Sequence, residues 1–401
     1  MACVRRGEFQ EGEDSPSGQD PGLEPPRSVM ACRPGAGWRV PLACFAIALF
    51  LKLGVSLAAM TFPMGGGGPG LGVHSRWMEI WCGVNTDLYL QIASMGYPSL
   101  DSGAESVLGL PIHYAFFPGY AMAIRLLWFL GSPATAGLLV STASLLLASV
   151  VLFRLVSLDH GPAVARWCVI CLYVFPSAFV LSDVMSESLF LLLTVGCAYQ
   201  CRLRRWGPAV CLGFLAALTR PFGVLTAVLI AGERYGGGCP GARGWTKSAL
   251  LAAAPVGGML LYGLFNWMTT GEFFAFVRVQ AMCQRHLSDP FTPLVGAMTG
   301  TLQASMAGGL SLFSLALLFL TRGKVRRSYW WFGLACVLAP LMTGSVLSMG
   351  RFLAVTWPVP MALALVMEES GVIGRLLVGF LVLVQILLLW MRACGAYGPV
   401  V

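Results

Sequence analysis

Apolar runs long enough to cross a bilayer recur along almost the whole chain. A spanning helix needs about 20 apolar residues to cross ~30 Å of hydrocarbon, and it satisfies its own backbone hydrogen bonds. The pattern therefore predicts an all-α polytopic membrane protein, a helical bundle with about nine to eleven transmembrane helices. The runs lie at residues 39–60, 133–153, 164–181, 185–201, 208–232, 248–268, 293–320, 328–348, 352–367 and 373–391, with a doubtful one at 115–131.

Two of these runs contain residues that disfavour a full crossing. The run at 115–131 holds a Pro-Gly pair and Arg125, and the run at 208–232 is interrupted by Arg220 and Pro221. A lipid-facing arginine is costly, and proline breaks a helix. The favoured interpretation is that neither segment crosses fully and that the basic loops are all cytoplasmic. The alternative is eleven full crossings, which puts the first two basic loops on the outer face. The basic loops contain Arg154 with Arg166, RLRRW at 202–206, Arg234 with Arg243 and Lys247, and RGKVRR at 322–327.

The polar segments divide the chain into three parts. Residues 1–37 are acidic and rich in Pro and Gly, so they are predicted to form a disordered N-terminal tail. Residues 38–392 form the multi-span domain, and residues 393–401 form a short C-terminal tail. On either topology the long first loop at 61–114 faces outside, and its only Lys or Arg is Arg76. The chemistry is expected in this outer loop.

Composition and charge exclude several classes of protein. The chain is 57% hydrophobic and 11% charged, whereas a soluble domain carries about a quarter charged residues. The formal net charge is +8, but the basic residues lie in short loops, which is the positive-inside pattern and not a nucleic-acid-binding surface. No nucleic-acid partner is predicted. The cysteines lie mostly within apolar runs, and the histidines lack metal-ligand spacing, so no metal site is expected.

Three acidic residues beside apolar runs are candidates for chemistry. Asp87 precedes a short amphipathic helix in the outer loop, where an acid serves either as a helix cap or as a general base. Asp183 and Glu187 stand four residues apart at the start of another apolar run. Acids at a helix N-terminus interact favourably with the helix dipole, but acids in a membrane protein also mark functional sites.

Six segments spread over about residues 75 to 365 resemble, in the same order, the sequence blocks of the PIG-V type mannosyltransferase family. That family includes the second mannosyltransferase of GPI-anchor synthesis and many bacterial membrane relatives. One such block would be weak evidence, whereas six in order are strong evidence. The segments are NTDLYLQIASMGY, YAFFPGYAMAIRLL, SDVMSESLFLLL, GFLAALTRPFGVL, WMTTGEFFAFVRVQAMCQRHLSDP and MGRFLAVTWP.

The resemblance implies a GT-C fold and a specific reaction. Enzymes of this kind take a sugar, here mannose or a similar hexose, from a polyprenyl-phosphate carrier on the outer or lumenal face. The acceptor would be a lipid-linked or cell-surface glycan. The segment around Asp87 is similar to the family signature WDxxWYxxIAxxGY, whose acid is the expected catalytic residue, although Thr86 stands where the signature has an aromatic. The reaction would be inverting, with Asp87 as general base and Glu187 as a second catalytic candidate.

A lipid-linked donor requires positive charge at its phosphate. Nucleotide sugars are absent outside the membrane, the phosphate leaving group needs a cation, and the acceptor hydroxyl needs a base. No DxD pair is present to hold a metal, so no metal or cofactor is expected. Arg220 and Arg351 are the phosphate candidates, because Arg binds phosphate in a bidentate manner; Arg351 could also be an ordinary interfacial arginine. His113 either orients a hydroxyl or lies in the interface, and Gln280, in the fifth segment, is a further candidate for substrate binding.

Two other functions compete with the transferase. Broken helices and intramembrane arginines are also typical of a secondary transporter or a lipid flippase, although no pair of matching halves is visible in this sequence. A non-catalytic scaffold is disfavoured, because charged residues are costly near a bilayer. The predicted partners are the lipid bilayer, the polyprenyl-phosphate sugar donor and a glycolipid or glycan acceptor. The expected location is the plasma membrane of a bacterium, or the endoplasmic reticulum membrane if the source is eukaryotic.

Overall fold

The computed structural model describes residues 37–61, 80–83, 85–101, 103, 106–107, 109–235, 242–283, 285–346 and 348–394. Of the predicted N-terminal tail at 1–37, the structure describes only Gly37. Of the predicted C-terminal tail at 393–401, it describes only residues 393–394.

The described chain is almost entirely helical, with one pair of two-residue strands. The strands pair antiparallel, with Ser106 opposite Pro111 and Val107 opposite Leu110. In chain order the α-helices, 3-10 helices (η) and strands are α1 (Arg39–Thr61), α3 (Thr86–Met95), β1 (Ser106–Val107), β2 (Leu110–Pro111), η2 (Ile112–Ala115), α4 (Pro118–Leu127), η3 (Trp128–Leu130), α5 (Pro133–Val174), η4 (Ala178–Ser182), α6 (Glu187–Arg202), α7 (Trp206–Thr219), η5 (Pro221–Leu225), α8 (Thr226–Tyr235), α9 (Ala242–Thr270), α10 (Ala275–Arg278), η6 (Val279–Cys283), α11 (Thr292–Thr299), α12 (Leu302–Leu320), α13 (Arg327–Leu341), α14 (Met349–Ala354) and α15 (Pro358–Ala393).

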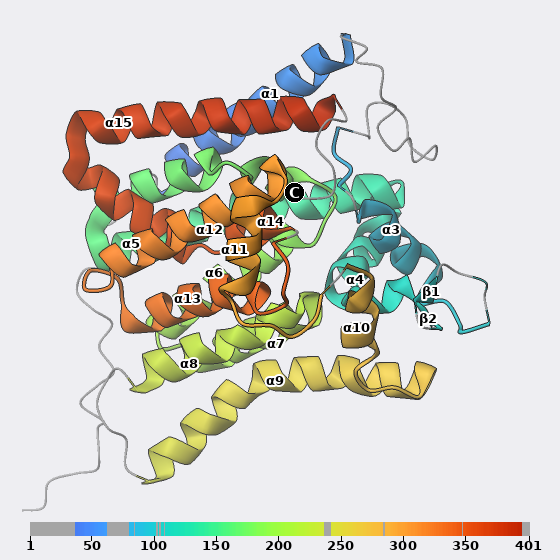
Figure 1. Ribbon diagram of the computed structural model, residues 1–401. Helices are drawn as coiled ribbons and strands as arrows, with labels where there is room; N and C mark the ends of the chain where they lie inside the picture. Colours follow the sequence, from blue (N-terminus) through green and yellow to red (C-terminus); the bar gives the residue numbers. More distant parts are fainter. Residues whose placement is uncertain are drawn as a thin grey trace, which may run out of the picture. The chain divides into compact units, whose positions relative to one another are not determined.

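Helix α5 is the centre of the helical packing. It packs against α6, α15, α1 and α4, and the largest apolar cluster joins it to α6, α13 and α15. The last helix, α15, also packs against the first, α1, so the two ends of the described chain lie side by side (Figure 1). The segment between α5 and α6 is therefore enclosed by elements from distant parts of the sequence.

Five described helices are long and apolar enough to cross a membrane. They are Arg39–Ala59, Pro133–Val174, Ser248–Thr270, Leu302–Leu320 and Pro358–Ala393. The second and the fifth are each two helices joined at a kink, at Gly161 (φ 83°) before Pro162 and at Gly371 (φ 53°). Glycine adopts a positive φ at little cost, and proline cannot continue the hydrogen bonding of a helix.

The two apolar runs that were predicted not to cross, at 208–232 and 115–131, do not form continuous spanning helices in the structure. Arg220 is extended (φ −152°, ψ 148°) between α7 and η5, because the residue before a proline is pushed out of the helical region. The doubtful run at 115–131 forms α4, which has ten residues and is therefore only about 15 Å long. A helix of that length does not cross ~30 Å of hydrocarbon. The run at 293–320 is likewise divided, into α11 and α12. The number of crossings and their direction stay predictions.

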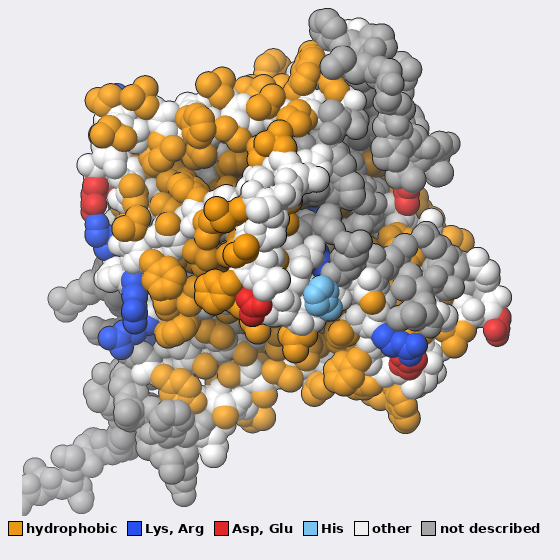
Figure 2. Space-filling model, in the orientation of Figure 1, with side chains coloured by type: hydrophobic (Ala, Val, Ile, Leu, Met, Phe, Trp, Pro, Cys, Tyr) orange, Lys and Arg blue, Asp and Glu red, His pale blue; other side chains and the backbone are white. Residues whose placement is uncertain are grey.

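The outer surface of the bundle is apolar over several helices, as expected for a protein in lipid. Large apolar side chains are exposed on α1, α9, α12 and α15, with Phe50 at 76% and Leu320 at 75% exposure. Figure 2 shows apolar side chains over much of one face, with Lys and Arg gathered at its edge. An apolar surface of this extent marks contact with a membrane or another protein.

The break at Arg220 depends on a close approach that only glycine permits. A Cβ at Gly223 would overlap the backbone carbonyl of Ala216 in α7, and a backbone atom cannot move aside. We expect Gly223→Ala to lower stability by about 1 to 3 kcal/mol, the usual cost of overpacking, or more. Thermal unfolding in detergent measures the effect, with Gly379→Ala in α15 as the control, since a Cβ there meets nothing within 4 Å. Equal melting temperatures for the two variants would contradict this account of the break.

Candidate active site

The residues just before α3 are docked on the segment that leads into α6. The backbone N–H of Val184 donates to the carbonyl of Trp81 at 2.8 Å, and the hydroxyl of Thr86 donates to the carbonyl of Val184 at 3.0 Å. The same hydroxyl accepts from the N–H of Gly83 at 2.8 Å. Thr86 is fully buried, so its hydroxyl has a structural role at the position where the family signature has an aromatic. These bonds fix where α3 begins.

Asp87 lies in the first turn of α3, where the helix dipole favours a negative charge. The N-cap position is occupied by Asn85, so the capping role considered for Asp87 does not apply. Asp87 is half-buried. Burial raises the pKa of the nearby Cys82 thiol to about 12, and the carboxylates of Asp183 and Asp87 add to that shift. Asp87 therefore lies close to Cys82, beside the docked segment.

One face of α3 continues from Asp87 to a buried histidine. Residues four apart share a face of a helix, so Gln91 lies one turn along from Asp87. Its Oε1 is 2.7 Å from Nε2 of His113, which is 7% exposed in η2. His113 is thus buried next to α3. Gln280 is half-buried in η6, which packs against η2, so the structure brings this candidate to the same region.

A second cluster gathers two arginines on one buried carboxylate. Glu187, the first residue of α6, is 2% exposed, and its Oε1 lies 2.8 Å from Nη1 of Arg220 and 3.7 Å from Nη1 of Arg351. Both arginine side chains are only 10% exposed. Nη2 of Arg351 also donates to the hydroxyl of Ser348 at 2.6 Å. The three side chains predicted separately from the sequence therefore form one site with an excess of positive charge.

Two short stretches of backbone, at the break after α7 and at α14, place Arg220 and Arg351 beside the Glu187 carboxylate. Arg220 projects from the extended break between α7 and η5, and Arg351 from α14, which follows a left-handed residue, Ser348 (φ 63°). Two guanidinium groups lie near the ring of Phe352, that of Arg220 at 5.2 Å and that of Arg285 at 5.1 Å from its centre. The sequence did not single out Arg285, although it stands in the fifth of the six segments.

Tyr89 connects the helix of Asp87 to the arginine cluster. It is two residues beyond Asp87 in α3, and its hydroxyl donates to that of Ser186 at 2.9 Å, next to Glu187. Burial raises the pKa of the Tyr89 phenol, and the positive charge of Arg220 opposes that shift. Asp87 and the arginine cluster are therefore held on neighbouring elements by one buried hydrogen bond.

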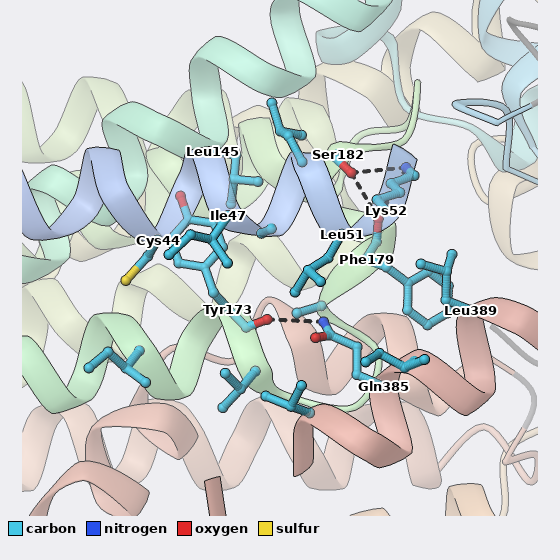
Figure 3. Close-up of a pocket in the computed structure, with 17 residues that line it drawn as sticks. Cys44, Ile47, Leu51, Lys52, Leu145, Tyr173, Phe179, Ser182, Gln385 and Leu389 are labelled. Carbon is cyan, nitrogen blue, oxygen red and sulfur yellow. Dashed lines mark hydrogen bonds between the residues drawn. The ribbon is translucent and has the colours of Figure 1, made fainter. Parts of the chain in front are cut away.

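A third buried group, not predicted from the sequence, surrounds Asp183. Its Oδ1 lies 2.5 Å from Nζ of Lys52 in α1, and its Oδ2 accepts from Nη1 of Arg392 in α15 at 2.7 Å. The same Nζ donates to the hydroxyl of Ser182 and to the carbonyl of Phe179 (Figure 3). Lys52 lies within the apolar run at 39–60 and Arg392 directly follows the run at 373–391, so the sequence pattern around them indicates only membrane helices.

An apolar cavity of about 300 Å³ lies beside this group, between α1, α5 and α15 (Figure 3). Lys52 lines it at one end, and its other lining residues are mostly apolar. Charges next to such a space are costly unless they are paired. Loss of Lys52, Asp183 or Arg392 would therefore leave a buried charge less well paired.

Within the described ranges, no three His, Cys, Asp or Glu side chains lie together as metal ligands would. The absence of a metal or cofactor from the reaction stays a prediction.

Comparisons with known proteins establish the fold. No protein-family model matches the chain, and no curated protein matches it. The archaeal oligosaccharyltransferase AglB from Archaeoglobus fulgidus, in complex with an inhibitory peptide and a dolichol-phosphate, matches 89% of this chain with a TM-score of 0.50 and 12% identity. ArnT from Cupriavidus metallidurans, bound to undecaprenyl phosphate, matches 88% of the chain with a TM-score of 0.48 and 13% identity.

The chain spans 56% of the length of AglB and 76% of that of ArnT. At such identities the similarity concerns the fold alone. Together with the helices that are long and apolar enough to span a bilayer, it confirms the predicted architecture: the chain is an integral membrane protein with a GT-C type helical fold.

Proposed function

We propose that this protein is a membrane glycosyltransferase of the PIG-V type. It transfers mannose or a similar hexose from a polyprenyl-phosphate carrier to a lipid-linked or cell-surface glycan acceptor. The transfer takes place on the outer or lumenal face of a bacterial plasma membrane or an endoplasmic reticulum membrane, with inversion. The AglB structure with the same fold holds a dolichol-phosphate, which is a lipid of the proposed carrier class.

The convergence of Arg220 and Arg351 on Glu187 is the observation that carries the proposal. Two guanidinium groups lie on one carboxylate in a buried place, where positive charge attracts an anionic group more strongly than it does in water. Arg285 adds a third guanidinium, 5.1 Å from the centre of the Phe352 ring. Arginine binds phosphate through two parallel hydrogen bonds, so this cluster suits the phosphate of the donor.

The chemical step needs a base and a stabilised leaving group. The acceptor hydroxyl attacks the anomeric carbon, a C–O bond forms, and the bond from that carbon to the phosphate oxygen breaks. The Asp87 carboxylate takes the hydroxyl proton, while the electron pair stays on the departing phosphate. That phosphate gains negative charge as it leaves, and prearranged arginines stabilise the growing charge in the transition state.

The remaining candidates receive roles from their contacts. Glu187 is ion-paired with both arginines, so we give it the positioning of the guanidinium groups and assign the base to Asp87. Gln91, on the same face of α3 as Asp87, holds His113, and Gln280 lies on the adjoining η6. These three polar side chains are suited to orient the acceptor hydroxyls near Asp87.

A transfer assay with purified protein tests the proposal. Protein in lipid nanodiscs is given polyprenyl-phosphate mannose with radioactive sugar and a panel of lipid acceptors. We expect label to appear on an acceptor only with the lipid-linked donor, and not with a nucleotide sugar. Movement of the labelled lipid across a vesicle membrane without any new glycosidic bond would instead favour the flippase. Absence of transfer with every acceptor and every polyprenyl-phosphate hexose would contradict the transferase.

A further inference from the structure

The ion pairs of Asp183 join three parts of the chain that are far apart in sequence. Lys52 comes from α1, Arg392 from the end of α15, and Asp183 from the turn after η4. Lys52 is 2% exposed, Asp183 1% and Arg392 20%. We name these three side chains the Asp183 clasp.

The clasp holds the backbone that precedes Asp87. Nη2 of Arg392 donates to the carbonyl of Cys82 at 2.6 Å, while Nη1 of the same guanidinium holds Asp183. The ammonium of Lys52 lies over the ring of Trp81, 4.7 Å from its centre. Both cations therefore contact Asp183 and also the segment at 81–82, five or six residues before Asp87.

The same segment is fixed from its other side. The backbone bond of Val184 to Trp81 and the hydroxyl of Thr86 attach it to the residues that follow Asp183. Gly83 fits closely against Met185, whose sulfur a Cβ at that position would overlap. Without the clasp, these backbone bonds would remain, but the Cys82 carbonyl would lose its guanidinium donor and the Trp81 ring would lose its cation.

Buried ion pairs of this kind contribute little net stability to a fold. Desolvation of buried charges offsets much of their attraction, and well-packed apolar residues often stabilise as much. What the Asp183 clasp provides is a geometry, in which the guanidinium of Arg392 bridges the Asp183 carboxylate and the Cys82 carbonyl. A bridging guanidinium fixes the orientation of a segment more specifically than apolar packing does.

We propose that the Asp183 clasp is a positioning device for Asp87. By holding Trp81 and Cys82 it sets the start of α3, and so the distance of the Asp87 carboxylate from the acceptor hydroxyl. The clasp touches no substrate in this scheme and acts only through Asp87. The inference rests on the proposed function, in which Asp87 is the base.

A double-mutant cycle between Arg392 and Asp87 tests the proposal. Arg392→Gln removes the charge and cannot bridge Asp183 and Cys82 as the guanidinium does. We expect kcat to fall about 10- to 100-fold, the effect of a displacement of about 1 Å in a reacting group, with an unchanged KM for the donor. Arg375→Gln, an exposed arginine of the same helix, is the matched control and should keep wild-type kinetics.

The decisive comparison is made in the Asp87→Asn background. If the clasp acts through Asp87, adding Arg392→Gln to Asp87→Asn should slow the residual reaction by less than about threefold, because interacting sites are not additive. A full further loss, equal to that in the wild-type background, would overturn the positioning role while leaving the base assignment intact. Wild-type turnover by Asp87→Asn alone would instead reject the base, and with it this inference.

Labelling of Cys82 gives a readout that needs no activity. The thiol is half-buried and its pKa is raised to about 12, so it reacts slowly with N-ethylmaleimide near neutral pH. Mass spectrometry of the Cys82 peptide should show faster labelling in Arg392→Lys, which keeps the positive charge that lowers the Cys82 pKa but has a single nitrogen and cannot bridge Asp183 and Cys82 as the guanidinium does. The rate should be unchanged in Arg375→Gln. An unchanged rate in Arg392→Lys would mean that the clasp does not hold the segment. If Arg392→Gln does not fold, Arg392→Lys also replaces it in the kinetic measurement.

Discussion

Asp87→Asn is expected to reduce transfer by about 100- to 10,000-fold, the usual contribution of general base catalysis, while the protein remains folded and inserted. The amide has the shape of the carboxylate, but it cannot take the proton of the acceptor hydroxyl. Asp87 lies in the first turn of α3 and not at its N-cap, so in a purely structural role the change to Asn would cost only the interaction of the charge with the helix dipole, about 0.3 to 1 kcal/mol. Single-turnover transfer of radioactive sugar measures the loss.

The control for this variant is its own folding. Asp87→Asn should elute as wild type in detergent and melt within a degree or two of it, because the side chain is half-buried in the first turn of α3. A well-folded Asp87→Asn enzyme with near-normal turnover would move the base to Glu187 or Asp183. Both of those acids hold cations in the structure, so either would first have to release one.

Arg220→Ala and Arg351→Ala should each lower kcat/KM for the donor by about 10- to 150-fold. This range corresponds to about 1.5 to 3 kcal/mol for a lost charge-assisted contact to phosphate. The released polyprenyl phosphate carries about −1.5 to −2 charges near pH 7, more than the donor diester. Inhibition by added polyprenyl phosphate should therefore weaken at least as much as donor use, and KM for the acceptor should change little.

Two controls separate phosphate binding from a loss of structure. Arg125→Ala removes an exposed arginine of α4 and should leave donor kinetics unchanged. Removing one partner of a buried ion pair costs about 3 to 5 kcal/mol, so thermal unfolding in detergent must show that each arginine variant is folded at the temperature of the kinetic measurement. Wild-type donor kinetics in both single arginine variants would place the phosphate elsewhere.

The sequence predicted the local features of the fold because local rules govern them. Apolar runs indicated the helices, and the pair Arg220-Pro221 indicated the break between α7 and η5, since a residue before proline adopts an extended conformation. The short α4 was likewise anticipated from the Pro-Gly pair and Arg125 in its run. Each of these signals lies within a few residues of the feature that it predicts.

The grouping of the site residues could not be predicted in the same way. Glu187, Arg220 and Arg351 were candidates for separate reasons, and their convergence depends on the packing of α6, η5 and α14. Lys52 and Arg392 were missed because a single cation in or next to an apolar run usually extends its charged end to the membrane surface. Only the folded chain places them on Asp183, which is 131 and 209 residues away in the sequence.

The bond between Arg392 and Cys82 has a consequence for synthesis of the protein. Its partners are 310 residues apart, and at 5 to 20 residues per second the ribosome needs roughly 15 to 60 s to progress from one to the other. For the last 209 residues of that interval Asp183 has been made but lacks its second cation. The growing chain is therefore expected to hold an incomplete, inactive enzyme until the last helix is made. A chain cut short before α15 should leave Asp183 paired with Lys52 alone.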